Sequence, residues 1–203
     1  MLVCTLVLTI APAAAQAADC ANADSTAQTA SAADLATATL CLVNGERAAA
    51  GRGALTAHGT LARTAQAYAS EMVASVRFAH EDANGGHVAD RVLSVGGSLD
   101  PWLELGENLG WGTLDQGTPR ALVAGWMNSP THRDNILYAR FNRLGIGIAD
   151  GVPAAGQSGG QTYVAVFGQV ATRKPAKPKR CRTRSKSRTA TRKARACRAR
   201  ARS

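Results

Sequence analysis

The stretch Gly125–Leu137, with the sequence GWMNSPTHRDNIL, decides how this chain folds. Its first residues complete a helix predicted over Pro119–Met127, which has a proline at its first position, where a missing N–H costs nothing. Pro130 ends that helix, because the residue before a proline is disfavoured in the helical region. His132 and Arg133 then open a second short run with helical apolar spacing. The stretch therefore predicts two short helices separated by a Ser-Pro break, with a histidine soon after the break.

Apolar periodicity predicts the remaining elements. A helix should begin with Asp34 as its N-cap and run to about Ala50. A second helix, Ala57–Val76, carries a buried stripe formed by Leu61, Ala65, Tyr68 and Met72. A short helix is possible over 88–95, and two strands rich in β-branched or aromatic residues follow, Leu144–Ala149 and Thr162–Val170. Helices on both faces of a small sheet predict an α/β fold, a three-layer α-β-α sandwich.

Charge is divided unevenly along the chain. The net charge is +10, but 15 of the 24 Lys and Arg residues lie between Arg173 and Ser203, where there is no Asp or Glu. The other 9 basic residues stand against all 14 acidic ones, so the rest of the chain has a charge of −5. The apolar pattern also stops at Thr172, and nothing after it could supply a core. We therefore expect a mildly acidic domain and a disordered Lys/Arg-rich tail over 171–203.

The N-terminal segment has the features of a secretory signal. Leu2–Ile10 is an apolar run too short to span a bilayer, and Ala15-Gln16-Ala17 fits an A-x-A cleavage site. This interpretation predicts a signal peptide over 1–17, a loosely ordered lead-in over 18–33 and a folded domain over 34–170. It also predicts a secreted, extracellular or cell-envelope location.

The cysteines are consistent with export. Cys4 lies within the predicted signal, and its removal leaves an even number: Cys20, Cys41, Cys181 and Cys197. In an oxidising compartment these four are expected to form disulfides, and three pairings are possible. Proximity along the chain favours Cys20–Cys41 and Cys181–Cys197. If the chain is not exported, free thiols are the alternative.

Several motifs in order resemble one known family. They are Phe78-Ala79-His80, Gly106-Glu107-Asn108-Leu109, the stretch Gly125–Leu137 and Arg143-Leu144-Gly145-Ile146-Gly147-Ile148. Together, from about Leu40 to Gln169, they resemble the CAP superfamily of cysteine-rich secretory, antigen 5 and pathogenesis-related proteins, in its compact bacterial branch. The resemblance implies an α-β-α sandwich with a small, mostly antiparallel sheet. It does not settle an activity, because the functions of CAP domains are scattered.

The resemblance also implies a cleft that holds two histidines and two glutamates. His80, Glu107 and His132 match three of these positions, whereas Ser129 stands where the family has its second glutamate. Two imidazoles and one carboxylate could hold Zn²⁺ or another divalent metal, with His80 and His132 as ligands and Glu107 as the candidate catalytic group. A hydrogen-bonded structural cluster is the alternative. Loss of the fourth group argues against an acid/base scheme that needs two carboxylates.

Three residues near these positions are interpreted as structural. Asn108 would tie the segment that carries Glu107 to a neighbouring helix through its amide. Arg133 is expected to form a salt link with an acid such as Asp134 or Glu104. Trp126 is expected to anchor the core, as most tryptophans do.

Three functions remain open at this point. The first is a secreted, non-enzymatic module whose cleft binds a small apolar or cell-envelope ligand and whose tail adheres to anionic wall polymers or lipid surfaces. The second is a metal-dependent hydrolase of extracellular peptides, and the third is an intracellular polyanion-binding protein. The tail has no aromatic residue for base stacking, so sequence-specific nucleic-acid recognition is not expected.

Overall fold

The computed structural model describes residues 19–100 and 102–171. The predicted signal peptide, the tail beyond Ala171 and the Cys181–Cys197 pair lie outside these residues. In chain order the elements are α1 (Ala32–Ala49), β1 (Thr56–Ala57), α2 (Gly59–Ser75), α3 (Val88–Ser94), β2 (Trp102–Gly112), the 3-10 helix η1 (Leu114–Gly117), α4 (Pro119–Asn128), α5 (Pro130–Leu137), β3 (Arg143–Asp150) and β4 (Gln161–Val170).

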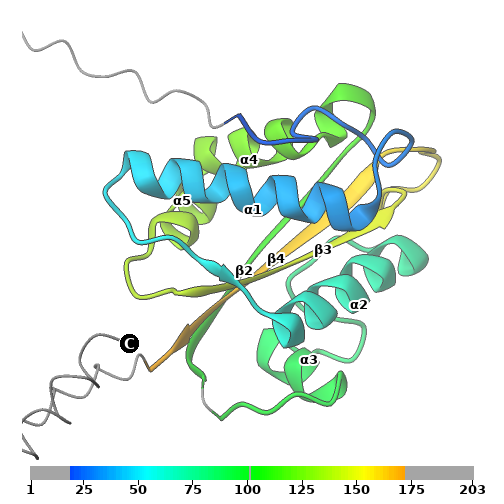
Figure 1. Ribbon diagram of the computed structural model, residues 1–203. Coiled ribbons are helices and arrows are strands. Elements are labelled where there is room, and N and C mark those ends of the chain that lie inside the picture. Colours follow the sequence, from blue (N-terminus) through cyan, green and yellow to red (C-terminus); the bar gives the residue numbers. More distant parts are fainter. Residues whose placement is uncertain (1–18, 101, 172–203) are drawn as a thin grey trace, which may run out of the picture. The chain divides into compact units, whose positions relative to one another are not determined.

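The strands form a four-stranded sheet in the order β1-β3-β4-β2. The short β1 pairs with β3 in parallel, and the other two pairings are antiparallel. Helices α1, α4 and α5 lie on one side of the sheet, and α2 and α3 lie on the other (Figure 1). The predicted three-layer α-β-α sandwich with a mostly antiparallel sheet is thus confirmed, and β2 lies at its edge.

Strand β4 shows why the sheet needs helices on both faces. Successive side chains of a strand point to opposite faces. Tyr163 and Phe167 belong to the core beneath α1 and α4, whereas Val164 and Val166 belong to the core beneath α2. All four are fully buried. A strand covered on both sides therefore has a continuous apolar sequence.

Two helices begin at residues other than the predicted ones. The N-cap of α1 is Ser31 rather than Asp34. Asp34 lies three residues after Ser31, and its carboxylate accepts from the backbone N–H of Ser31, which completes a capping box. Helix α2 begins at Gly59 rather than Ala57, because Thr56 and Ala57 pair with β3 as β1. The sequence offers several capping residues close together, and tertiary pairing selects among them.

Strand β2 was not predicted, although it carries the central acid of the site. Its glycines give it a low intrinsic strand propensity. They are required by packing: a Cβ at Gly106 would lie 2.8 Å from Cζ of Phe141, and one at Gly110 would lie 2.6 Å from Cδ1 of Leu122. Close approach of neighbouring side chains thus explains a glycine-rich strand that local propensity disfavours.

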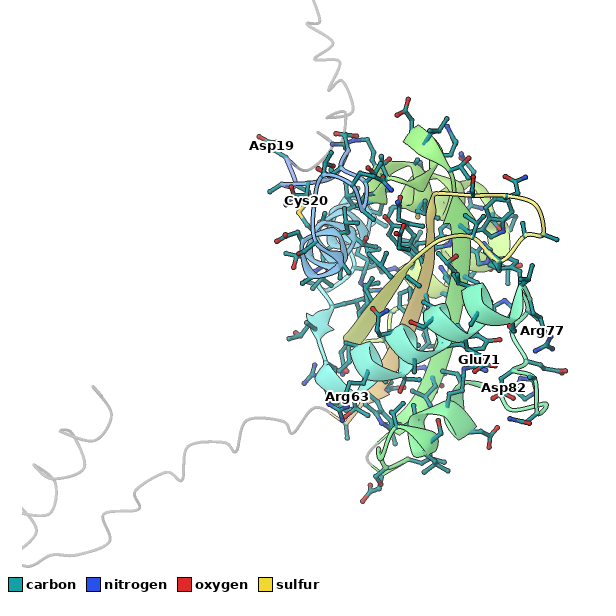
Figure 2. All side chains as sticks on the ribbon, turned by 90° about the vertical axis from the view of Figure 1, so that its right-hand side faces the viewer. Asp19, Cys20, Arg63, Glu71, Arg77 and Asp82 are labelled. Carbon is teal, nitrogen blue, oxygen red and sulfur yellow. A yellow bond between two sulfur atoms is a disulfide. The ribbon has the colours of Figure 1, made fainter. Side chains whose placement is uncertain are left out.

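The segment before α1 is attached to the domain covalently and by packing. Cys20 and Cys41 form a disulfide, as predicted, and its sulfur atoms are visible beside α1 in Figure 2. Cys20 and Ala23 are buried in the core. The backbone N–H of Arg120 on α4 donates to the carbonyl of Ala23 at 2.9 Å, and its guanidinium pairs with Asp24 at 2.8 Å. Residues 19–31 therefore pack on the domain, and α1 begins before the expected boundary at 34.

Replacing both Cys20 and Cys41 by serine is expected to lower the free energy of unfolding by about 3 kcal/mol. The disulfide closes a loop with a sequence separation of 21 residues, and a crosslink of this span restricts the unfolded chain. Urea denaturation of the oxidised protein and the double-serine variant measures the difference. A loss below about 1 kcal/mol would show that packing alone holds the segment.

Candidate functional site

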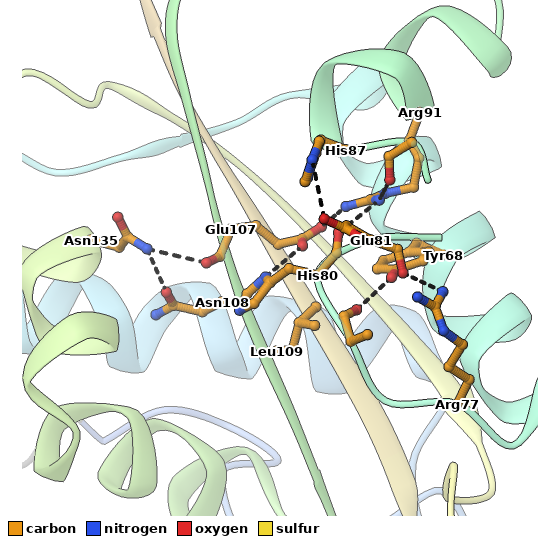
Figure 3. A network of polar contacts seen from close by, with 12 residues as sticks. Tyr68, Arg77, His80, Glu81, His87, Arg91, Glu107, Asn108, Leu109 and Asn135 are labelled. Atoms are coloured by element: carbon orange, nitrogen blue, oxygen red, sulfur yellow. Dashed lines mark hydrogen bonds and ion pairs between the residues drawn. The ribbon is translucent and has the colours of Figure 1, made fainter. Parts of the chain in front are cut away.

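His80 and Glu107 are in direct contact, although 27 residues separate them in the sequence. His80 lies in the loop between α2 and α3, and Glu107 lies on β2. The distance from His80 Nδ1 to Glu107 Oε1 is 2.9 Å (Figure 3). The side chain of His80 is 58% exposed and that of Glu107 only 6%. The pair thus has a buried acid and an imidazole that solvent can reach.

Arg91 holds the other oxygen of the same carboxylate. Its Nη2 donates to Glu107 Oε2 at 2.6 Å, and the arginine side chain is also only 6% exposed. Its Nη1 donates to the carbonyls of His80, at 3.1 Å, and of Gly86, at 2.9 Å. The guanidinium stacks on the ring of Tyr68, with Cζ 3.6 Å from the ring centroid. One buried arginine therefore fixes both Glu107 and the loop that carries His80.

Sequence reasoning did not connect Arg91 to the site. It lies on α3, 16 residues before Glu107, at a position where a short helix would ordinarily place an exposed arginine. The available signal was indirect: Gly85 and Gly86 lie just before α3, and the loop they form has carbonyls that need donors.

The start of α5 is attached to β2 by two asparagines. Nδ2 of Asn108 donates to the backbone carbonyl of His132 at 2.9 Å. Nδ2 of Asn135 donates to Oδ1 of Asn108 at 2.9 Å and to the carbonyl of Glu107 at 3.1 Å. Asn108 is fully buried. The amide of Asn108 thus joins the strand carrying Glu107 to the helix carrying His132, and Asn135 was not predicted to take part.

Ser129 is both the C-cap of α4 and the N-cap of α5, so the two helices turn at one residue. His132 follows in the first turn of α5 and is half-buried. Burial lowers the pKa of His132 below its usual value, and the nearby His80 lowers it further. Within the described residues, no hydrogen bond joins the imidazole of His132 to His80 or Glu107. The structure therefore joins His80 to Glu107 and places His132 beside them.

An open groove of about 390 Å³ lies next to this cluster and includes His132 in its wall. Its other lining residues come from β2, η1, α4 and the loop after α2: Phe78, Leu109, Gly110, Trp111, Gln116, Ala121, Leu122, Gly125, Trp126 and Ser129. Phe78 is 46% exposed and Trp111 37%. The wall is mainly apolar, and His132 is its single titratable residue.

Trp126 and Arg133, both predicted to be structural residues, differ in burial and in their contacts. Trp126 is buried and donates from Nε1 to the carbonyl of Leu109 at 2.8 Å. The expected salt link of Arg133 is wrong: Glu104 pairs with Arg140 at 2.5 Å instead. Arg133 is exposed and forms no ion pair within residues 19–100 and 102–171. The helical turn directs it to solvent, whereas Arg140 lies in the loop that passes Glu104.

As arranged, the three predicted site residues do not fit a metal ion. Within the part of the chain that the structure describes, no three His, Cys, Asp or Glu side chains converge as metal ligands. Both oxygens of Glu107 and the Nδ1 of His80 already have partners. Ser129 stands at the position where the family has its second glutamate. Its hydroxyl is a weaker metal ligand than a carboxylate. A zinc site ordinarily needs at least three protein ligands.

Comparison with known proteins agrees with this fold. The sequence model of the family described as "CAP: Cysteine-rich secretory protein family" matches residues 40–167. This range is more than half of the chain, so the protein belongs to the CAP family.

One curated relative comes from a bacterium. The chain is 35% identical over 109 residues to the uncharacterized protein YkwD of Bacillus subtilis, a match that covers 54% of this chain and 40% of YkwD. The chain thus spans less than half the length of that relative.

Two solved structures share the fold. An extracellular SCP-domain protein of Bacillus anthracis has a TM-score of 0.55 and 24% identity, covering 64% of this chain and 39% of that one. A cysteine-rich secretory protein of Staphylococcus aureus has a TM-score of 0.52 and 17% identity, covering 68% and 39%. At these identities the likeness shows the fold alone. No helix among the described residues has the length and apolar character needed to cross a bilayer.

Proposed function

We propose that this protein is a secreted, non-enzymatic CAP module that binds a small apolar or cell-envelope ligand in the groove between β2 and α4. The groove itself is the observation that carries the proposal. Its volume of about 390 Å³ lies in the range of small-molecule sites, and its wall combines apolar surface with a few polar groups. Two of its aromatic side chains, Phe78 and Trp111, are partly exposed. A bound apolar molecule would cover that surface.

The state of Glu107 supports binding rather than catalysis. A general base must be free to accept a proton from substrate or water. Glu107 is buried, and its two oxygens accept from His80 and Arg91. It does not line the groove. The residue best placed to touch a bound ligand is His132, which can offer one hydrogen bond to a polar head group.

The tail supplies a second element of the proposal. Its 15 Lys and Arg residues would attract an anionic wall polymer or lipid surface, with strong dependence on salt. Secretion would put such surfaces within reach. In this proposal the tail determines where the protein resides and the groove determines what it binds.

Filling the groove is expected to abolish binding while the fold is retained. Gly125 lies on α4 in the wall of the groove, and a Cβ built there meets no atom within 4 Å. A Gly125→Phe variant therefore places its ring in free space, and replacing a helical glycine favours the helix. We expect at least about a tenfold loss of affinity for the neutral apolar fluorophore N-phenylnaphthylamine, since the ring would occupy its site. Fluorescence titration measures this.

Gly53→Phe is the matched control. Gly53 lies in an exposed loop away from the groove, and a Cβ there also meets no atom within 4 Å. The same added ring should leave binding unchanged. Equal binding by the wild type and Gly125→Phe would refute the groove as the ligand site, provided that circular dichroism shows both variants folded.

A metal-dependent peptidase is the second candidate, because His80, Glu107 and His132 stand at three of the family's cleft positions, although their contacts among the described residues form no metal site. It is tested by incubating the purified protein with a peptide library, with Zn²⁺ and with a chelator. Cleavage that requires both the metal and His132 would establish it and remove the non-enzymatic proposal.

A further inference from the structure

We propose that the guanidinium of Arg91 takes the place that a metal ion would hold in this cleft, so that the cluster is complete without a metal. This goes beyond the proposed ligand binding and stands independently of it. The physical requirement is simple: a buried carboxylate needs a positive partner. That partner can be a metal ion or a side chain, and here it is a side chain.

The contacts of Glu107 show that the carboxylate is already satisfied. Arg91 donates to Oε2 at 2.6 Å, a short charge-assisted bond. His80 contacts Oε1 at 2.9 Å. Both side chains of the Arg91–Glu107 pair are only 6% exposed. A cation that approached Glu107 would therefore have to break a buried ion pair and would face the positive charge of Arg91.

Arg91 cannot readily move aside to admit a metal. Two backbone carbonyls accept from its Nη1, those of His80 and Gly86. The face of its guanidinium rests on Tyr68, whose hydroxyl in turn donates to the carbonyl of Ala79. The arginine is thus fixed by three elements: the loop that carries His80, helix α2 and strand β2. Withdrawing it would leave these part-buried carbonyls without their donor.

The remaining donors are too few for a metal. With Glu107 engaged, the cleft offers the Nε2 of His80 and the imidazole of His132, and Ser129 stands at the fourth family position. Two imidazole nitrogens give two protein ligands, below the three of catalytic zinc sites and the four of structural ones. The loss of the family's second glutamate and the internal pairing of Glu107 both argue against a metal ion in this cleft.

The first test uses the full-length protein and zinc alone. If the cleft binds no metal, any zinc that the oxidised protein binds is held elsewhere and does not use His80. We therefore expect the zinc affinities of the wild type and His80→Gln, measured by isothermal titration calorimetry, to differ by less than about twofold. His80 is largely exposed, so this variant should fold. A drop of at least about tenfold in His80→Gln would overturn the proposal, because it would show that the cleft binds zinc with Arg91 present.

The second test removes the internal cation. An Arg91→Gln variant leaves Glu107 without its positive partner, so Zn²⁺ should now bind beside His80 and stabilise the fold. At a hundredfold excess over Kd we expect Tm to rise by about 5–10 °C in Arg91→Gln, against no such rise in the wild type. The double variant Arg91→Gln/Glu107→Gln is the control and should lose this response, since its carboxylate is gone. A folded Arg91→Gln variant whose response to Zn²⁺ equals that of the wild type would contradict the proposal.

Discussion

A Gly147→Ala variant is expected to lose more than about 3 kcal/mol of unfolding free energy, although it adds a single methyl group. Gly147 lies on β3, where the sheet packs directly against the backbone of α2. The added Cβ would lie 2.1 Å from the backbone N of Gln66 and 2.2 Å from the carbonyl carbon of Ala65. Helix backbone cannot rotate away as a side chain can. Urea denaturation followed by far-ultraviolet circular dichroism measures the loss.

The matched control is the same substitution at Gly125, where the added methyl group meets no atom within 4 Å. Gly125 is inside α4, and alanine is favoured over glycine in a helix by up to about 1 kcal/mol. Gly125→Ala should therefore leave stability unchanged or slightly raised. If Gly147→Ala lies within about 1 kcal/mol of the wild type, α2 and the sheet are not as close as the structure indicates.

Replacement of Arg47 by methionine is expected to destabilise the domain by about 3–5 kcal/mol. Arg47 is fully buried on α1. Its side chain donates to four backbone carbonyls: Gly53 at 2.8 Å, Ile136 at 2.6 Å, Tyr138 at 3.0 Å and Phe141 at 3.2 Å. Methionine has a similar length but no donor, so these carbonyls would lose their partner.

Arg52→Met is the control for this change. Arg52 is exposed beyond the end of α1, and its loss should change stability by no more than about 0.5 kcal/mol. Burial lowers the pKa of Arg47, and the nearby charge of Arg52 lowers it further. Guanidinium denaturation of both variants gives the comparison. A cost below about 1 kcal/mol for Arg47→Met would mean that water replaces the arginine as donor.

The sequence predicts much of this fold where periodicity and propensity agree. The stripe on α2 and the apolar strand β4 are examples, because burial on one side and on both sides leaves recognisable patterns. Strand β2 has no such pattern. Its glycines are required by close contacts with Phe141 and Leu122, which lie further along the chain. Local sequence does not reveal a steric requirement set by residues that lie 35 positions away from Gly106 and 12 positions away from Gly110.

The candidate site, like the fold, could be predicted only in part. Resemblance to the family located His80, Glu107 and His132, whose spacing alone would not have united them. It could not locate Arg91, whose role depends on how the loop after α2 folds over Tyr68. It also could not show that Arg133 faces solvent while Arg140 takes Glu104. Side-chain contacts that depend on loop conformation can be assigned only from the folded structure.

Strand β2 is the last strand of its sheet, and an uncovered edge of this kind can recruit a strand from another molecule. Two of its backbone carbonyls already accept hydrogen bonds from side chains, that of Leu109 from Trp126 and that of Glu107 from Asn135. An incoming strand would have to compete with these two side chains for main-chain acceptors, which disfavours self-association of the protein along this edge.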